Sequence, residues 1–310
     1  EAGGIDDVVV LQAVCRADRQ LELVDLAQQV LVERHLRRMA LFLGRARLLE
    51  IDEELAPVLP ELSPLKGFEQ NKSHRYGVWE HTLKVIEALG AVVDVLDEDY
   101  SEEGAGNLAD GLVVLRLGRY RQTISNYLAQ ELVPGRPLLA LLTFAALYHD
   151  TGKPETRQRN ESGDWSFGGH AARGAEFGLR RAGQLHVSRC GIEFLRSLVA
   201  NHWRPTELVR AGGQPSRRDI YQFFQASGEH GIAVCLHSIA DLMGKYGPEL
   251  PRKELEARLG VVRSLLEAYF ERYGELVAPP QLLDGGELME GRWRFLCSVC
   301  RGLAAVGRAG

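Results

Sequence analysis

The sequence predicts an all-α fold. In most segments apolar residues recur with a period near 3.6, which is the spacing that one buried face of a helix requires. Prolines and glycines interrupt this pattern between the periodic segments. Alternation of apolar and polar residues, which is typical of a half-buried strand, is weak and limited to residues 8–11. We therefore expect a helical bundle.

The first predicted helices lie in residues 21–50, where leucines and valines recur at helical spacing. Pro57, Pro60 and Pro64 then indicate a connector, because proline removes a backbone donor and interrupts a helix. A second helix is predicted from about Val78 to Leu96. Residues 97–106 are acidic and contain glycine, so an exposed loop is expected there.

Residues 138–149 are apolar on almost every side, which predicts a buried central helix ending at Gly152 and Pro154. Ser188 is expected to begin another helix. Ser216 and Asp219 form a capping-box pattern ahead of an apolar segment. Two further helices are predicted over 232–243 and 254–273. These segments suggest an N-terminal helical neck region (1–66), a central helical domain (67–250) and a C-terminal helical tail (251–310).

Composition limits the classes of function. The chain has 310 residues, a net charge of −5, 45% hydrophobic and 25% charged residues, which is ordinary for a globular protein. That charge gives no overall basic field for nucleic acid. The longest apolar run, 138–147, is too short to span a bilayer. We see no signal peptide, and five scattered cysteines favour a reducing, cytoplasmic compartment.

The Cys297–Cys300 pair near the C-terminus has two interpretations. It resembles half of a zinc site, but it lacks a second pair of ligands nearby. The alternative is that the two cysteines are buried residues of a helix.

Six polar residues occur inside or beside apolar helical segments, and they are the candidate metal ligands. A lone histidine in such a place is usually a hydrogen-bonded core residue, but an ordered set is different. Burying several imidazoles and carboxylates is costly unless they share partners, and a divalent metal satisfies several at once. The set is His81, His149, Asp150, His170, His202 and Asp241.

The flanks of these residues resemble a known family. The order H…HD…D, with further histidines between, is similar to the HD-domain superfamily of metal-dependent phosphohydrolases. The resemblance extends over residues 20–290 to the HD region of bacterial tRNA nucleotidyltransferase and poly(A) polymerase proteins. It rests on APVLPEL (56–62), VWEHTL (78–83), LYHDTGKPET (147–156), FGGHAARGAEF (167–177), NHWRP (201–205), RDIYQFFQASGEHGIAVCLHSIAD (218–241) and PPQLLDGGEL (279–288).

The resemblance implies an HD-domain helical bundle with flanking helical segments, in which 67–250 is the metal-binding domain. It implies a first metal held by four of the six residues (His81, His149, Asp150, Asp241) and a second held by His170 and His202, with Asp150 bridging. Two divalent transition metal ions are expected, because mixed imidazole and carboxylate ligands suit Mn²⁺, Fe²⁺, Ni²⁺ or Zn²⁺.

Further residues are candidates for contact with substrate. Asp150 and Lys153 are the expected catalytic residues, and Lys153 also supplies a compact positive charge for a phosphate oxygen. Arg173 and Arg204 are further candidates for binding phosphate, although each is also interpretable as an exposed helix arginine. His237 shares a helix face with Asp241 but lies outside the HD pattern, so it is left out of the ligand set.

The resemblance implies a metal-dependent phosphohydrolase (phosphodiesterase, phosphatase or nucleotidase) that acts on nucleotides or RNA-terminal phosphates. The expected partners are a nucleotide or phosphorylated RNA end, and tRNA, with no membrane. Two alternatives remain open: a non-catalytic helical module that supports tRNA or RNA, and a nucleotide-sensing regulatory HD domain. The Gly-rich turn and paired aspartates of a nucleotidyltransferase head are not found, so addition of nucleotides is not expected.

Overall fold

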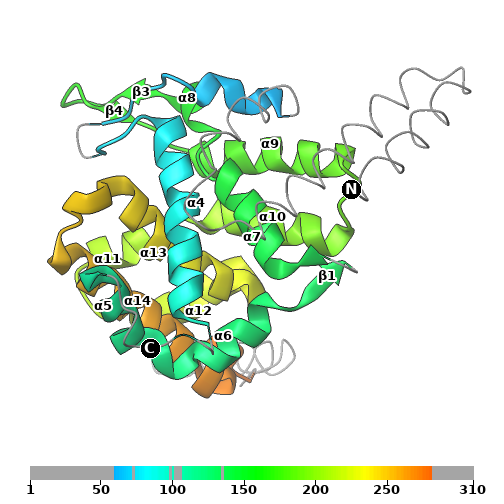
Figure 1. Cartoon of the computed structure of the whole chain (residues 1–310), viewed down its shortest axis with the longest axis vertical. Helices are drawn as coiled ribbons and strands as arrows, with labels where there is room; N and C mark the ends of the chain where they lie inside the picture. Colours follow the sequence, from blue (N-terminus) through cyan, green and yellow to red (C-terminus); the bar gives the residue numbers. More distant parts are fainter. Residues whose placement is uncertain (1–58, 72–73, 98–99, 101–106, 134–135, 281–310) are drawn as a thin grey trace, which may run out of the picture.

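The computed structural model describes residues 59–71, 74–97, 100, 107–133 and 136–280. This part of the chain is predominantly helical, which confirms the all-α prediction (Figure 1). In chain order the elements are η1 (Pro60–Leu65), α4 (Val78–Val95), α5 (Leu108–Leu117), η3 (Gly118–Tyr120), α6 (Arg121–Leu128), β1 (Glu131–Val133), β2 (Arg136–Pro137), α7 (Leu138–Tyr148), α8 (Lys153–Thr156), β3 (Gln158–Arg159), β4 (Trp165–Ser166), α9 (His170–Gln184), α10 (Arg189–Asn201), α11 (Arg204–Arg210), α12 (Arg217–Ser227), η4 (Gly228–His230), α13 (Gly231–Tyr246), η5 (Gly247–Glu249), α14 (Arg252–Glu271) and η6 (Tyr273–Val277).

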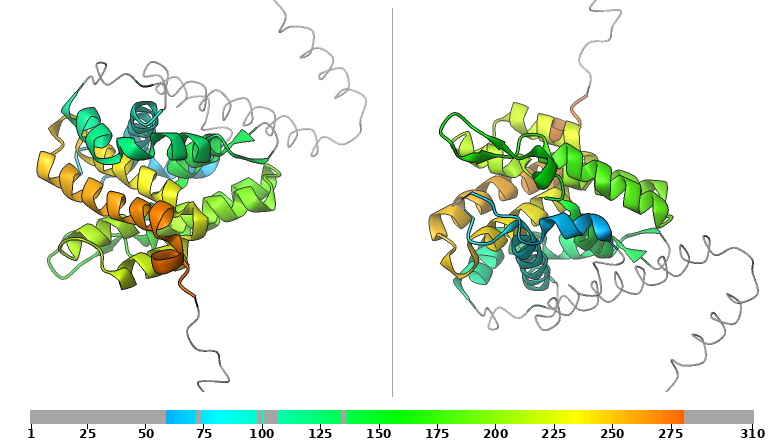
Figure 2. Two further views of the ribbon diagram at one scale, coloured as in Figure 1. Left: turned by 90° about the horizontal axis from the view of Figure 1, so that it is seen from below. Right: turned by 90° about the horizontal axis from the view of Figure 1, so that it is seen from above.

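Helices α4 and α13 pack against each other at the centre of the bundle. Gly244 of α13 allows their close approach, because a Cβ there would lie 2.8 Å from a side-chain carbon and 2.9 Å from the backbone nitrogen of Val85 in α4. Helix α14 lies along the other side of α13, as the orange and yellow helices of Figure 2 show. The two helices that bear the first and last candidate ligands are thus direct neighbours.

Helix α7 occupies the interior, as its sequence predicts. All of its residues except Leu139 are buried, and it packs against α4, α9 and α10. The interior of a helical bundle accepts a helix with no polar face, since other helices cover every side. Its C-terminal end carries His149 and Asp150 into the core.

Helix starts follow the expected capping chemistry. Ser188 accepts a hydrogen bond from the Gly191 backbone N–H at 3.2 Å and begins α10. Ser216 and Asp219 form the reciprocal capping box that begins α12, with bonds of 3.2 and 2.9 Å. Both predicted helix starts are confirmed.

The structure adds two small antiparallel ladders that the sequence pattern did not predict. Strand β1 pairs with β2, and β3 pairs with β4. Each strand has two or three residues, which is too short for alternation to be detectable. The predicted helices of 21–50, the candidate strand at 8–11, most of the 97–106 loop and the Cys297–Cys300 pair lie outside the described residues. No described helix is long and apolar enough to cross a membrane.

Candidate metal centre

All six candidate ligands meet in the core at the ends or inner faces of five helices. His81 lies in the first turn of α4, and Asp241 lies on α13. His149 and Asp150 directly follow α7, His170 is the first residue of α9, and His202 directly follows α10. Residues up to 160 positions apart in the sequence therefore converge on one site.

The first group of potential ligand atoms contains His81, His149 and Asp150, whose donor atoms all lie within 4.8 Å of one another. The His149 Nε2 atom is 3.1 Å from Asp150 Oδ2, and His81 Nε2 is 3.6 Å from the same oxygen. Asp241 is not in this group by the same distance limit. Its Oδ1 atom is nevertheless 3.1 Å from His81 Nε2 and 4.0 Å from His149 Nε2.

A second group contains Asp150, His170 and His202, again with donor atoms within 4.8 Å of one another. His170 Nε2 lies 3.6 Å from Asp150 Oδ1, the oxygen that does not face the first group. The two groups therefore share Asp150, with one carboxylate oxygen toward each. A carboxylate placed in this way has one oxygen available to a cation on each side.

Backbone carbonyls fix the orientation of three imidazoles. The Nδ1 atoms of His149, His170 and His202 lie 2.7, 2.8 and 2.7 Å from the carbonyl oxygens of residues 146, 167 and 199. A carbonyl only accepts, so each Nδ1 carries the hydrogen and each neutral ring has a bare Nε2. Such bonds are the usual supporting contacts of histidines that bind metal.

The short distance between His170 and His202 is the clearest sign that a cation belongs here. Their Nε2 atoms are 3.2 Å apart. With hydrogens on both Nδ1 atoms, two lone pairs face each other, and that contact is repulsive unless a proton or a cation lies between them. Two nitrogens bound to one ion at 2.0–2.1 Å are separated by roughly 3.0–3.4 Å at ordinary coordination angles.

Burial keeps these imidazoles neutral. It lowers the pKa of His202 to about 3, with the nearby His149 and His170 contributing in the same direction. Burial also lowers the pKa of His170. A proton is therefore not available at neutral pH to relieve the Nε2–Nε2 contact, and a metal ion fits that requirement.

The two carboxylates are ionised. Burial alone raises the pKa of Asp150, but His149 and Lys153 outweigh that effect and hold it well below its ordinary value. The same holds for Asp241, whose pKa is lowered mainly by the adjacent His81. Burial lowers the pKa of His149, but the neighbouring Asp150 outweighs burial and raises the pKa overall.

Hydrogen bonding in the first group is incomplete without an ion. Both ring nitrogens of His81 and the Nε2 of His149 are buried, yet none makes a contact with the geometry of a hydrogen bond. Buried polar groups without partners are costly and uncommon in native proteins. The residues present therefore fit a divalent metal: they are of the right ligand type, they are oriented toward one another, and several of their polar atoms lack a hydrogen-bond partner.

The candidate substrate contacts differ in their surroundings. Lys153 is buried, and its Nζ lies 2.6 Å from Asp150 Oδ2 and also donates to Gln70. Arg173 forms ion pairs with Glu155 and Glu176, which occupy its guanidinium. Arg204 donates to Asn201 at 2.6 Å and lies over the ring of Trp203, without an ion pair among the described residues.

Two further histidines adjoin the site. His237 is fully buried, with its ring centroid 4.9 Å from that of His149 and neither ring nitrogen hydrogen-bonded. The His74 ring lies 5.7 Å from His81. The spacing of His237 and Asp241 was a usable signal, since residues four apart share a helix face. The contact of His74 with His81 could not be predicted from helical spacing, because His74 precedes α4 in an irregular segment.

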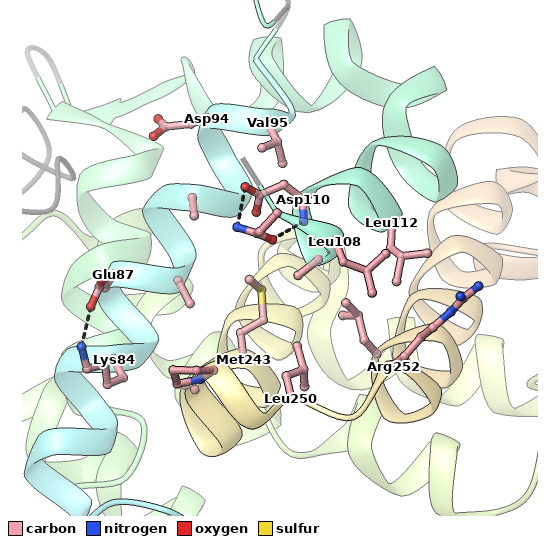
Figure 3. Close-up of a pocket in the computed structure, with 18 of the residues that line it drawn as sticks. Lys84, Glu87, Asp94, Val95, Leu108, Asp110, Leu112, Met243, Leu250 and Arg252 are labelled. Carbon is pink, nitrogen blue, oxygen red and sulfur yellow. Dashed lines mark hydrogen bonds and ion pairs between the residues drawn. The ribbon is translucent and has the colours of Figure 1, made fainter. Parts of the chain in front are cut away.

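A separate cavity of about 1010 Å³ lies between α4, α5, α13 and the start of α14 (Figure 3). Its lining mixes apolar residues with Lys84, Glu87 and Arg252. Lys84 pairs with Glu87, as the dashed line in Figure 3 marks. None of the six candidate ligands lines it, so the cavity and the candidate metal centre are distinct.

Half of the chain is similar to part of a known protein. A stretch of 157 residues is 32% identical to the CC-adding tRNA nucleotidyltransferase of Thermus thermophilus. The match covers 50% of this chain but 26% of that protein, so the chain spans about a quarter of its relative. No family model matches the sequence. Half of the chain is therefore similar to part of a tRNA nucleotidyltransferase, and the described residues contain a His/Asp cluster compatible with metal binding.

Proposed function

We propose that this protein is a metal-dependent phosphohydrolase of the HD type, which hydrolyses a phosphate ester of a nucleotide or of an RNA end. One observation carries the proposal: Asp150 presents one oxygen to each of two groups of buried histidines, and in the second group two bare Nε2 atoms face each other 3.2 Å apart. Paired divalent ions are a common way to hydrolyse phosphate esters.

The ligand roles follow from the two groups. His81, His149 and Asp241 would hold one ion together with Asp150, and His170 and His202 would hold the other with the second oxygen of Asp150. When bound, such ions acidify a water molecule and polarise a phosphoryl oxygen. The carbonyls that accept from the Nδ1 atoms keep the imidazoles oriented, so little reorganisation is needed when substrate arrives.

Lys153 would orient the phosphate. One of its three donors is directed at Asp150 and another at Gln70. The remaining donor is available for a phosphate oxygen, and the ammonium offsets the negative charge that substrate brings to a carboxylate-rich site. Because Lys153 is 6% exposed, water competes weakly for that contact.

Hydrolysis of nucleotides and of oligoribonucleotides with a terminal or cyclic phosphate tests the proposal. We expect turnover in Mn²⁺ or Ni²⁺, loss after chelation, and loss in His202→Ala. The matched control is His186→Asn, because His186 is exposed with a positive φ that asparagine tolerates. Turnover that persists in His202→Ala, or after chelation, contradicts the proposal.

The similarity to a tRNA nucleotidyltransferase favours a second candidate, a helical module that supports tRNA without catalysis. The two candidates differ in what the metal centre does. If tRNA binds with a steep salt dependence, no phosphate ester is turned over, and His202→Ala leaves binding unchanged, then the supporting role is correct.

A further inference from the structure

Two arginines stack on one tryptophan in the β3–β4 hairpin. The Arg157 and Arg159 Cζ atoms lie 3.5 and 3.8 Å from the centre of the Trp165 ring. Arg159 is the cross-strand partner of Trp165, and Arg157 is two residues earlier, so both arginines fall on the same side of the extended chain. The Trp165 carbonyl accepts from Asn71 Nδ2 at 2.6 Å, which ties the hairpin to the chain ahead of α4.

These guanidinium groups lack a carboxylate partner among the described residues. Arg75, Arg119 and Arg173 also lie over aromatic rings, but each is paired with at least one glutamate. Arg204 lies over Trp203 without an ion pair in the described ranges, but its Nε donates to Asn201. Arg157 lies over the rings of Phe68 and Trp165, and its buried Nε has no hydrogen-bond partner in the part of the chain that the structure describes. Arg159 donates from one terminal nitrogen to the Gly163 carbonyl. The remaining donors of the two guanidinium groups are available for an anion, and phosphate matches their fork geometry.

The hairpin adjoins one of the two partly exposed ligands of the metal centre. The His170 side chain is 20% exposed and that of Asp241 is 23% exposed, against 3% for Asp150. The Nδ1 of His170 bonds to the carbonyl of Phe167, which directly follows β4. The Lys153 ammonium lies 5.6 Å from the Phe167 ring. Arg157 is four residues beyond Lys153, about 6 Å of helical rise, and Figure 1 shows β3, β4 and α8 together.

We propose that Arg157 and Arg159 bind a second phosphate group of the substrate, adjacent to the one that Lys153 and the metal centre receive. The substrate would then carry at least two phosphates, as a polynucleotide chain or a nucleoside polyphosphate does, rather than one. This inference rests on the proposed function, because the metal centre defines the first phosphate position.

The test compares substrates that differ in phosphate number. The substrates are p-nitrophenyl phosphate, a short oligoribonucleotide with a terminal phosphate, and a nucleoside triphosphate. The variants are Arg157→Gln, Arg159→Gln and Arg157→Lys, with Arg189→Gln as the control because Arg189 is 91% exposed and remote in sequence. Far-ultraviolet circular dichroism and melting temperature establish that each variant is folded.

We expect Arg157→Gln to raise KM for the substrates with several phosphates by about tenfold or more, since bonds to charged groups are worth that much. KM for p-nitrophenyl phosphate and its kcat should stay within about twofold. Arg157→Lys should recover part of the loss, because charge is kept and the fork is not. Whichever of the oligonucleotide and the triphosphate shows the larger effect identifies the source of the second phosphate.

Equal effects on all three substrates, or no effect on any, overturn the inference. If the wild-type protein hydrolyses none of them, the proposed function fails, and binding is the readout instead. A fluorescent oligoribonucleotide should then bind the wild-type protein at least about tenfold more tightly than Arg157→Gln, with a shallower salt dependence in the variant. Equal binding in that case overturns the inference as well.

Discussion

Replacing Gly152 by alanine tests how the metal centre is assembled. Gly152 follows the His149–Asp150 pair and packs against the start of α9, where His170 lies. A Cβ on Gly152 would lie 2.1 Å from the carbonyl oxygen of His170 and 2.8 Å from the backbone nitrogen of Gly174. Both neighbours are backbone atoms, so rotation of a side chain cannot relieve the overlap.

The size of the effect follows from these distances. Ordinary contact begins at 3.4 Å, so the start of α9 has to move by roughly 1.3 Å. Overpacking of this kind costs about 1–3 kcal/mol, which lowers the melting temperature by roughly 2–12 °C for a domain of this size. The displacement also changes the 3.6 Å separation of His170 Nε2 and Asp150 Oδ1, whereas ligand distances tolerate about 0.2 Å.

Gly168→Ala is the matched control, because a Cβ at Gly168 meets nothing within 4 Å although His170 is two residues away. Differential scanning calorimetry and elemental analysis measure both consequences. We expect Gly152→Ala to melt earlier and to lose the ion held by His170 and His202, while Gly168→Ala resembles the wild type. Equal melting temperature and metal content in the two variants would refute this reasoning.

Three further predictions concern stability. Burial raises the pKa of Glu61, but its bonds to Arg181 and Tyr148 outweigh that and hold the pKa below 4.5. Arg181→Met should therefore lower the free energy of unfolding by about 1–3 kcal/mol at pH 7. In urea denaturation, the difference from the wild type should vanish as the pH falls below that lowered pKa. Ser216→Ala should remove the α12 capping box and lower the free energy of unfolding by about 1 kcal/mol. The control is Ser162→Ala, which lies in an exposed turn. Chelation should lower the melting temperature, because an ion at 100 times its Kd contributes about 2.7 kcal/mol, and an unchanged melt would argue against bound metal.

Much of the site was predictable because polar, ionisable side chains occur there within apolar segments of the sequence. His149 and Asp150 end the most apolar helix of the chain, and a buried imidazole and carboxylate need partners wherever the helix lies. Helix starts at Ser188 and Ser216 were also local, since a capping side chain bonds within its own first turn. The roles of the site residues remain predictions that the experiments above address.

Other features depend on contacts that one segment does not determine. Lys153 follows a glycine and resembles an exposed loop residue, but Gln70 and Asp150 enclose it. The His74 ring reaches His81 because the chain reverses where the Val78 N–H donates to the Phe68 carbonyl at 2.8 Å. The β3–β4 ladder is too short to carry a periodic signal, although it positions Arg159 on Trp165.

Metal content of four purified proteins tests the shared role of Asp150 most directly. Elemental analysis after loading with Mn²⁺ should find two ions in the wild type, one in His81→Ala, one in His202→Ala, and none in Asp150→Ala. Each of these proteins should retain a cooperative melt, so that lost ions reflect lost ligands. Two ions retained in Asp150→Ala, or none bound by the folded wild-type protein, would contradict the dinuclear centre.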